Sequence, residues 1–414
     1  MSQTTFRIVV IGGGAAGHMA AISAKEHRPD ATVLLLEKSD KWLAKVRISG
    51  GGRCNVTHHC AEPRKLARHY PRGEAFVRKV FTAWGQPEAV AWFSAHGVAL
   101  KVEADGRMFP ITDDSRTVID ALQRAVRSFG VEARSHCPVT GIERKGGTWS
   151  LRVPGGTLQA DRVVVATGGS PKEEGLTWLK VLGHEIVPAV PSLFTFNLPG
   201  DPIRELMGVV AADVRLRIAG TKLESTGPLL ITHWGLSGPA VLRLSAFGAR
   251  ALHDLRYEYT VLVDWLGEMG EKGARELLHV EANAHPRRQV VNAECFSLPA
   301  RLWNYLLLRA GLSLEKPLGE LGRKGADRLL DVLTNDRYQA RGKTTFKEEF
   351  VTAGGLALQH VDPATMESRV APGLHFAGEV LDIDGITGGF NFQAAWSTGW
   401  LAGKGAAGSD IRTP

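Results

Sequence analysis

The chain has 414 residues, of which 44% are hydrophobic and 22% charged, and its formal net charge at pH 7 is +7. This length predicts two to three domains with an ample core, and the composition is that of a globular protein rather than a disordered or fibrous one. Apolar runs all fall well short of the ~20 residues that a membrane-spanning helix needs, so we expect no contact with a membrane.

The cysteines and basic residues exclude further classes. Cys54, Cys60, Cys137 and Cys295 are scattered and form no C-x-x-C pair, which argues against a disulfide framework and a dithiol redox centre. His and Cys residues nowhere have zinc spacing, so no metal site is expected. The chain enters an apolar run by Phe6 without a basic segment or cleavage site before it. We therefore expect no signal peptide and a cytoplasmic location.

The N-terminal segment has the pattern of a dinucleotide-binding unit. An apolar run at Phe6–Ile11 predicts a buried parallel strand, and it leads into G-x-G-x-x-G with glycines at 12, 14 and 17. A helix at Ala15–His27 and a second strand at Thr32–Leu36 follow, and that strand ends at Glu37. Gly12 permits the tight turn, Gly14 lets the backbone approach a pyrophosphate, and Gly17 lets helix and strand pack closely. Glu37 would accept hydrogen bonds from a ribose, which favours FAD or NAD over NADP.

The next hundred residues predict helices and then short strands. Residues 64–99 have helical periodicity, and a helix capped by Asp113, Asp114 or Ser115 should run to Phe129. Four short strands then predict a small antiparallel meander: Val131–Arg134, Val139–Glu143, Trp149–Val153 and Thr157–Ala160. A buried strand from Asp161 ends in Gly168 and Gly169, as expected where a parallel strand's carboxyl end approaches a ligand.

The pattern changes after Pro191, which indicates an inserted domain. Residues 192–267 alternate apolar and polar side chains and predict an antiparallel β module, whereas 268–344 read as mainly helical. Near residue 345 the chain should return to the first domain, where residues 350–356 predict a strand that runs into a glycine turn. We therefore expect one discontinuous domain of residues 1–191 and 345–414, and an inserted domain of residues 192–344.

The C-terminal segment from His375 to Gly399 reads as a strand, a glycine-rich loop and a helix. A helix N-terminus preceded by glycines offers free backbone N–H groups to an anion or a carbonyl. Because a similar element opens the chain, one long ligand held by both ends of the sequence is expected.

These residues resemble a known family, the YhiN/BaiN-like flavoproteins, which are bacterial FAD-dependent oxidoreductases. Ile48–Thr57 is similar to the family's Ser-Gly-x-Gly-Arg-Cys-Asn-x-Thr signature, and Gly106–Pro110 to its Gly-Arg-x-Phe-Pro element. Further matches extend the resemblance over essentially the whole chain: Thr-His-x-Gly-x-Ser-Gly-Pro at 232–239, Thr-Ala-Gly-Gly-Val nearly matched at 352–356, Phe-Ala-Gly-Glu-Val-Leu-Asp at 376–382, and Gly-Gly-Tyr-Asn, with Phe for Tyr, at 388–391. Arg47, His58 and the helix start near Asp114 depart from the family's pattern and put the substrate in doubt.

The resemblance implies an α/β fold. It consists of a glutathione-reductase-like Rossmann FAD-binding domain, with a parallel sheet and a small antiparallel meander, interrupted by one inserted β-plus-helical domain. It also implies that the amides of Gly388, Gly389, Phe390 and Asn391 face the flavin's N1–C2=O edge, where the dipole of the last helix would favour hydride acceptance. The expected FAD-binding residues are Gly12, Gly14, Ala15, Ala16, Gly17, Glu37, Lys38, Lys45, Gly51, Gly52, Arg53, Cys54, Val139, Thr167, Gly168, Gly378, Glu379, Gly388, Gly389, Phe390 and Asn391.

Three residues are candidates for the chemistry itself. Cys54 is a candidate catalytic thiol, with a buried structural cysteine as the alternative. His233 could supply the proton that accompanies hydride in reducing a C=C or C=O bond, or could be an ordinary loop histidine. Arg107 could bind a substrate carboxylate or pair with Asp105.

The sequence therefore predicts a FAD-dependent oxidoreductase, reduced by NADH or NADPH and acting on a small organic substrate. One alternative is a flavin-containing RNA-binding or tRNA-modifying protein, because the chain is basic. The basic residues are dispersed and no cluster of stacking aromatics accompanies them, which argues against a nucleic-acid partner. An NAD dehydrogenase is a further alternative.

Overall fold

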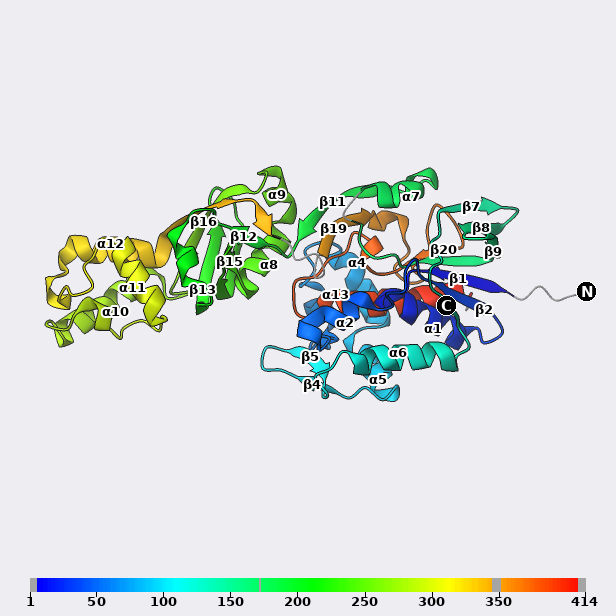
Figure 1. Cartoon of the computed structure of the whole chain (residues 1–414), viewed down its shortest axis with the longest axis horizontal. Helices are drawn as coiled ribbons and strands as arrows, with labels where there is room; N and C mark the ends of the chain where they lie inside the picture. Colours follow the sequence, from blue (N-terminus) through cyan, green and yellow to red (C-terminus); the bar gives the residue numbers. More distant parts are fainter. Residues whose placement is uncertain (1–5, 171–172, 345–350, 409–414) are drawn as a thin grey trace, which may run out of the picture. The chain divides into compact units, whose positions relative to one another are not determined.

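The computed structural model describes residues 6–170, 173–344 and 351–408, which form two compact units (Figure 1). The first unit comprises Met1–Pro191 and Lys347–Pro414, and the second comprises Ser192–Phe346. The boundaries expected from the sequence lie after residues 191 and 344. The expected return of the chain near residue 345 lies outside the described residues.

A parallel sheet forms the centre of the first unit. Its strands lie in the order β20 (Leu374–Phe376), β10 (Arg162–Val165), β1 (Arg7–Ile11), β2 (Thr32–Leu36) and β6 (Glu132–Arg134). The apolar residues of β1, β2 and β10 are buried, as expected for a parallel sheet covered on both faces. This topology confirms the predicted Rossmann fold.

Two helices from opposite ends of the sequence pack on one another beside this sheet. They are α1 (Ala15–His27) and α13 (Phe390–Ala406). The helices approach closely because glycine lines the contact: a Cβ added at Gly403 would lie 2.2 Å from the Ala20 carbonyl oxygen, and one at Gly399 would lie 2.5 Å from the Ala16 carbonyl oxygen. The contact brings the two predicted ligand-binding ends of the chain together.

The antiparallel meander is smaller than predicted. It consists of β7 (Gly141–Lys145), β8 (Thr148–Val153) and β9 (Gly156–Ala160). The first of the four expected strands, β6, instead pairs in parallel with β2 at the edge of the main sheet. The prediction was wrong for this strand because a three-residue strand carries no signal of which partner it will pair with.

The remaining elements of the first unit surround the sheet. Helices α2 (Ala44–Ile48), α3 (Pro63–Ala67), α4 (Glu74–Ala83), α5 (Gln86–Ala95), α6 (Arg116–Ser128) and α7 (Thr177–Val181) belong to it. A small antiparallel sheet has the order β3 (Thr57–His58), β5 (Arg107–Pro110) and β4 (Leu100–Val102). Strands β11 (Ile186–Ser192) and β19 (Val351–Leu356) pair near the boundary with the second unit.

The second unit consists of a sheet and a helical part. Its described residues form a seven-stranded sheet in the order β17 (Asp336–Arg341), β16 (Glu258–Asp264), β13 (Val210–Ile218), β14 (Glu224–Ile231), β15 (Gly235–Ser237), β12 (Thr195–Asn197) and β18 (Lys343–Thr344). Helices α8 (Pro239–Phe247) and α9 (Ala249–Asp254) follow β15, and the helical part holds α10 (Gly270–Ala284), α11 (Ala300–Arg309) and α12 (Gly322–Asn335). Residues 336–344 were assigned to the helical part, but most of them form β17 and β18, which return to the sheet.

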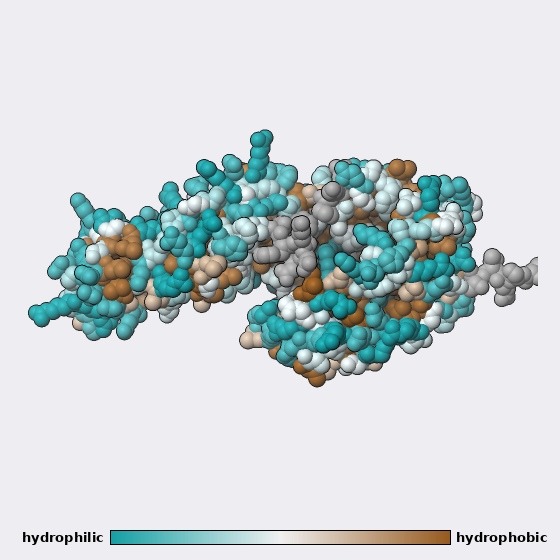
Figure 2. Space-filling view, in the orientation of Figure 1, coloured by the Kyte–Doolittle hydropathy of each residue, from teal (hydrophilic) through white to brown (hydrophobic). Residues whose placement is uncertain are grey.

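The surface is mainly hydrophilic on the face that Figure 2 shows, and apolar residues gather over the helical part of the second unit. Exposed apolar side chains there include Leu277 and Val280 on α10 and Leu308 on α11. Over the described stretches of the chain, every helix is too short or too polar to cross a membrane.

Candidate functional site

The glycine turn after β1 has the close contacts that the fingerprint requires. Gly12 has φ +113°, and a Cβ there would lie 2.3 Å from the Ala166 carbonyl oxygen of the neighbouring strand end. A Cβ at Gly17 would lie 1.8 Å from the Gly12 carbonyl oxygen. Among the described residues, a Cβ at Gly14 would meet no heavy atom within 4 Å. Gly12 and Gly17 therefore serve internal packing, whereas Gly14 faces open space from which a ligand can approach.

Glu37, at the end of β2, also organises this turn. One carboxylate oxygen accepts from the Gly13 amide (2.8 Å), and the other accepts from the Ser39 amide (3.0 Å) and hydroxyl (2.9 Å). A carboxylate has about four acceptor positions, so one remains for a ribose hydroxyl. The Cys137 amide donates to the Glu37 carbonyl (2.9 Å), which brings the segment that contains Val139 beside this strand end. Lys38, by contrast, is exposed.

Sequence reasoning missed two aromatic residues that support the turn. The Trp42 ring covers Gly13, because a Cβ at Gly13 would lie 2.5 Å from it. His18 is buried below the turn, and its Nδ1 lies 3.0 Å from the Gly14 carbonyl oxygen. Burial lowers the pKa of His18 to about 4, so the ring is neutral at pH 7 and its Nδ1 carries the proton. His18 follows the fingerprint directly, but its type alone does not indicate this role.

Residues from the two ends of the chain meet next to this turn. Gly378 has φ +75°, its amide donates to the Thr398 hydroxyl (2.9 Å), and a Cβ there would lie 2.9 Å from the Ala16 Cβ. Glu379 forms an ion pair with Lys45 (2.6 Å). Both members of this pair were expected to bind FAD, and the structure places them together. Thr167 is exposed after β10, and Gly168 beside it has φ +77°.

The N-cap residue of α13 is Gly389, which has no side chain with which to cap the helix. Gly388 and Gly389 have φ +124° and +91°. The Asn391 side chain closes the preceding loop, because it accepts from the Gly385 amide (2.8 Å) and donates to the Gly385 carbonyl (2.9 Å). The buried Tyr70 hydroxyl donates to the Phe390 carbonyl (2.5 Å). The first amides of a helix have no carbonyl partner within it, so this end is a positively polarised donor site.

The signature segment at 48–57 packs directly against that helix end. The Asn55 side-chain oxygen accepts from the Gly389 amide (3.0 Å), and a Cβ at Gly389 would lie 2.6 Å from the Thr57 backbone. The Thr57 hydroxyl donates to the Gln393 side chain (2.5 Å). The segment and α13 therefore form one unit of structure, although more than 300 residues separate them.

His58 continues this contact. Its Nδ1 lies 3.2 Å from the Gly388 carbonyl oxygen, and its ring stacks on Phe390 with 4.6 Å between ring centroids. Burial lowers the pKa of His58 below its ordinary value, so the ring is neutral at pH 7 and a hydrogen bond to this carbonyl requires the proton on Nδ1. In the sequence, His58 is visible only as a departure from the family's pattern.

The candidate catalytic residues lie in different surroundings. Cys54 is fully buried, and burial raises the pKa of its thiol to about 12, so the reactive thiolate is absent at neutral pH. This environment favours the structural interpretation of Cys54. His233 lies in the second unit, in the exposed turn between β14 and β15, next to Trp234. Its carbonyl accepts from the Arg204 side chain (2.7 Å).

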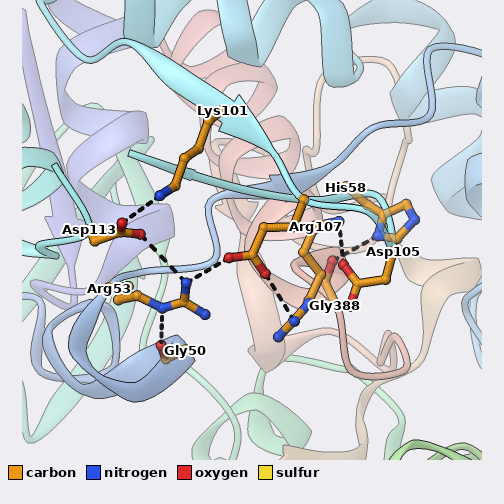
Figure 3. Close-up of polar contacts among 9 residues, drawn as sticks. Gly50, Arg53, His58, Lys101, Asp105, Arg107, Asp113 and Gly388 are labelled. Carbon is orange, nitrogen blue, oxygen red and sulfur yellow. Dashed lines mark hydrogen bonds and ion pairs between the residues drawn. The ribbon is translucent and has the colours of Figure 1, made fainter. Parts of the chain in front are cut away.

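Arg53 and Arg107 belong to one network of charges, shown in Figure 3. Glu103 accepts from Arg53 (2.6 Å) through one carboxylate oxygen and from Arg107 (3.0 Å) through the other. Arg107 also donates to Asp105 (2.7 Å), and Asp113 lies 3.5 Å from Arg53 and pairs with Lys101. Arg107 thus forms the pair with Asp105 that was the alternative to a substrate contact.

The residues present fit FAD. At the dinucleotide end there is open space above Gly14 and a free acceptor position on Glu37. At the other end, the polarised N-terminus of α13 is suited to the electron-rich edge of a flavin. Gly51 and Gly52, where an added Cβ would meet no described heavy atom within 4 Å, leave room for backbone contact with a ligand.

Comparison with known proteins agrees with this fold. The model of the family described as HI0933-like protein Rossmann domain matches residues 6–405. The chain is 30% identical to the 3-dehydro-bile acid delta(4,6)-reductase of Clostridium scindens, over 97% of this chain and 99% of that protein. It is also 30% identical to the ribosomal RNA dihydrouridine synthase of Escherichia coli, over 96% of this chain and 97% of that protein.

Solved structures resemble the chain in fold. The 3-ketosteroid-delta4-(5alpha)-dehydrogenase from Rhodococcus jostii RHA1, in complex with 4-androstene-3,17-dione, has a TM-score of 0.50 and 14% identity, and the match covers 98% of each chain. The 3-ketosteroid delta1-dehydrogenase from Sterolibacterium denitrificans has the same TM-score and identity, with coverage of 99% and 100%. At this identity the likeness shows the fold alone.

Proposed function

We propose that this chain, a FAD-dependent oxidoreductase that belongs to the HI0933-like protein Rossmann domain family, reduces a carbon–carbon double bond next to a carbonyl in a small ring compound. NADH or NADPH would supply the electrons. The observation that carries the proposal is the packing of the Asn55 segment against the Gly389 amide, which fixes the polarised end of α13 in the first unit. The names of the two relatives support the same chemistry, because each denotes saturation of a ring double bond conjugated to a carbonyl.

When bound, FAD supplies the relay of hydride from nicotinamide to acceptor. The chain's own residues hold and polarise it. Gly14 would admit the pyrophosphate, Glu37 would accept from the ribose, and the ion pair of Lys45 with Glu379 lies where the two ends of the chain meet. The first amides of α13 would stabilise negative charge that develops at the ligand, as preorganised dipoles do in other active sites.

The reaction also needs a proton, because saturating a double bond adds one hydride and one proton. We propose that His233, an exposed histidine of the second unit, supplies this proton. A His233→Asn variant should lose about 100-fold in kcat, while bleaching of the flavin by the nicotinamide keeps its wild-type rate. Unchanged kcat would remove His233 from the proposal.

A second candidate substrate is a uracil base in ribosomal RNA. The E. coli relative favours it, since it matches this chain at the same 30% identity and nearly the same coverage as the reductase. The many ion pairs that neutralise arginines, such as Arg53 with Glu103 and Arg275 with Asp327, favour the small molecule. Both substrates would require the same hydride and proton addition.

The test is an anaerobic titration of the purified protein with NADH and then NADPH, followed by the acceptor. Bleaching of the visible flavin band by either nicotinamide, and its return on adding 4-androstene-3,17-dione, is the expected result. Return of the band with a uridine-containing ribosomal RNA fragment, but not with the steroid, would select the second candidate. A colourless protein that takes up no FAD would overturn the proposal.

A further inference from the structure

The turn at Gly50–Gly52 depends on contacts outside itself for its conformation. Gly50, Gly51 and Gly52 all have positive φ, at +58°, +69° and +85°. Three consecutive glycines lack side chains with which to hold a conformation, and glycine has the largest backbone entropy to lose. The turn is held by the Ser115 amide, which donates to the Gly52 carbonyl (2.8 Å), and by Arg53, whose Nε donates to the Gly50 carbonyl (3.3 Å).

Arg53 is itself held by the hairpin of β4 and β5. Its guanidinium donates to Glu103 (2.6 Å) in the hairpin turn and stacks on the Phe109 ring, 4.0 Å from its centroid. The Phe109 ring also packs directly against Gly50 and leaves no space for a side chain, because a Cβ added at Gly50 would lie 2.8 Å from the ring. Glu103 is in turn held by Arg107 (3.0 Å).

Two segments are predicted to hold the flavin: the Gly50–Gly52 turn and the start of α13 at residues 388–391. The hairpin of β4 and β5 also contacts residues next to the second of these flavin-holding segments. A Cβ at Gly106, in the hairpin turn, would lie 2.6 Å from the His58 ring, and His58 contacts the Gly388 carbonyl. Figure 3 shows Arg53 with Gly50 at the left of the view, and His58 and Gly388 at the right. The hairpin therefore braces both segments.

We propose that Glu103 is a positioning residue for FAD: through Arg53 it holds the Gly50–Gly52 turn in the conformation that retains the flavin. This inference rests on the proposed function for the identity of the cofactor and adds the residue that governs its retention. Glu103 acts through Arg53, since Arg53 links the hairpin to the turn.

The proposed effect is local, and this makes it separable from stability. The side chains of Arg53, Glu103 and Arg107 are 32%, 26% and 38% exposed, and ion pairs this open to solvent add little to overall stability. They are also screened by salt. Loss of Glu103 should therefore loosen the turn and the cofactor while the unfolding temperature of the apoprotein stays nearly constant.

The experiment measures the rate of FAD dissociation from the holoprotein, by recovery of flavin fluorescence, at low and high sodium chloride. It compares wild type with Glu103→Gln, Arg53→Gln and the double variant. Glu224→Gln, which removes a more exposed ion pair with Arg215 in the second unit, is the control. The unfolding temperature of each apoprotein is measured in parallel.

We expect Glu103→Gln to release FAD about tenfold faster than wild type. The double variant should be no faster than Arg53→Gln, since Glu103 acts through Arg53. Salt should speed release from wild type more than from Glu103→Gln, in which only the longer ion pair of Arg53 with Asp113 remains. Glu224→Gln should behave as wild type. A purely structural role of the ion pair would instead lower the unfolding temperature of the apoprotein.

Release of FAD from Glu103→Gln within twofold of wild type, or strictly additive effects of the two substitutions, would overturn the inference. A further outcome is that Glu103→Gln releases FAD faster than wild type, but neither nicotinamide bleaches the flavin of the holoprotein. This outcome would overturn the proposed reaction and leave this inference standing. A wild-type chain that binds no FAD would overturn both.

Discussion

His18 and His375 are the two most deeply buried histidines among the described residues of the first unit, and both are neutral. His18 lies under the glycine turn and His375 lies on β20, each with about 2% or less of its surface exposed. Burial, the main cause in both cases, lowers the pKa of His18 to about 4 and that of His375 to about 3. Each ring therefore stays neutral in the folded protein at a pH where the unfolded chain would be protonated.

Stability should consequently fall with pH below about 6.5, the ordinary histidine pKa. In that range the unfolded chain binds more protons than the folded one, so the free energy of unfolding decreases as pH decreases. Between pH 8 and pH 5, the protonation difference at each histidine should lower the free energy of unfolding by about 2 kcal/mol. Urea unfolding of the apoprotein across this range measures the slope. A His375→Gln variant should have a shallower slope, and an identical slope would contradict the assignment to this residue.

The ion pair of Arg72 and Asp384 leads to a second prediction at this scale. The Asp384 side chain is 0% exposed and accepts two hydrogen bonds from the Arg72 guanidinium, which joins the C-terminal glycine loop to the segment before α4. Arg72→Met should destabilise the protein by about 3–5 kcal/mol, because the buried carboxylate then loses the charge of Arg72. The double variant Arg72→Met/Asp384→Leu should recover much of that loss in urea unfolding. A double variant no more stable than the single one would show that the charge is not the cause.

Individual site residues were visible in the sequence where their role is steric. The roles of Gly12 in the turn and of Gly17 in close packing were indicated by their positions in the fingerprint, and neither has space for a Cβ. Gly389 was expected to offer its amide to the flavin, but in the structure that amide donates to Asn55. The partners of charged residues were not visible. Arg53 was expected to bind FAD, and the structure adds that it donates to Gly50 and Glu103. Long charged side chains choose partners by proximity in space, and the sequence does not contain that information.

Among the elements, the contact of α1 with α13 depends on glycine. Gly399 and Gly403 lie four residues apart on one face of α13 and touch backbone atoms of α1. A helix after the C-terminal loop was predicted, but its partner was not. Because helices choose partners by shape, one sequence pattern is compatible with several neighbours.

A methyl group at this contact should separate the helices. Gly403→Ala should destabilise the apoprotein by about 2 kcal/mol, because its Cβ would lie 2.2 Å from the Ala20 carbonyl oxygen. Gly325→Ala in α12 is the matched control. Its Cβ would lie 3.6 Å from Leu312, so higher helix propensity should stabilise it by up to about 1 kcal/mol. Urea unfolding of both variants measures these changes. Equal changes in the free energy of unfolding would contradict a specific clash at Gly403.

At the scale of the whole molecule, the second unit is an insertion between paired strands. β11 precedes the insertion and β19 follows it, and a Cβ at Gly354 would lie 2.5 Å from the Pro188 carbonyl oxygen. The pairing of β11 with β19 therefore joins the two parts of the first unit at the point of insertion. The expected FAD-binding residues all lie in the first unit, and His233 lies in the second.

Removing the insertion should separate cofactor binding from turnover. A chain in which a Gly-Ser linker of about eight residues joins Pro191 to Val351 should bind FAD, because the glycine turns and both flavin-holding segments remain. It should lose turnover, because His233 is gone. The visible spectrum and the anaerobic titration measure the two properties. Normal turnover by the shortened chain would refute the role of His233, and a colourless one would show that cofactor binding requires the second unit.

The sequence by itself determined the Rossmann fold, the family and the two glycine turns at the ends of the chain. These features are local. The missing Cβ of a glycine determines the conformation of a turn, and an alternating or continuous apolar pattern determines a strand, each within a few residues. The tertiary structure decided which strand β6 joins, how residues 336–344 return to the sheet, and that the hairpin of β4 and β5 holds Arg53. Each of these depends on contacts between distant segments, and such contacts are selected by the packing of the whole chain.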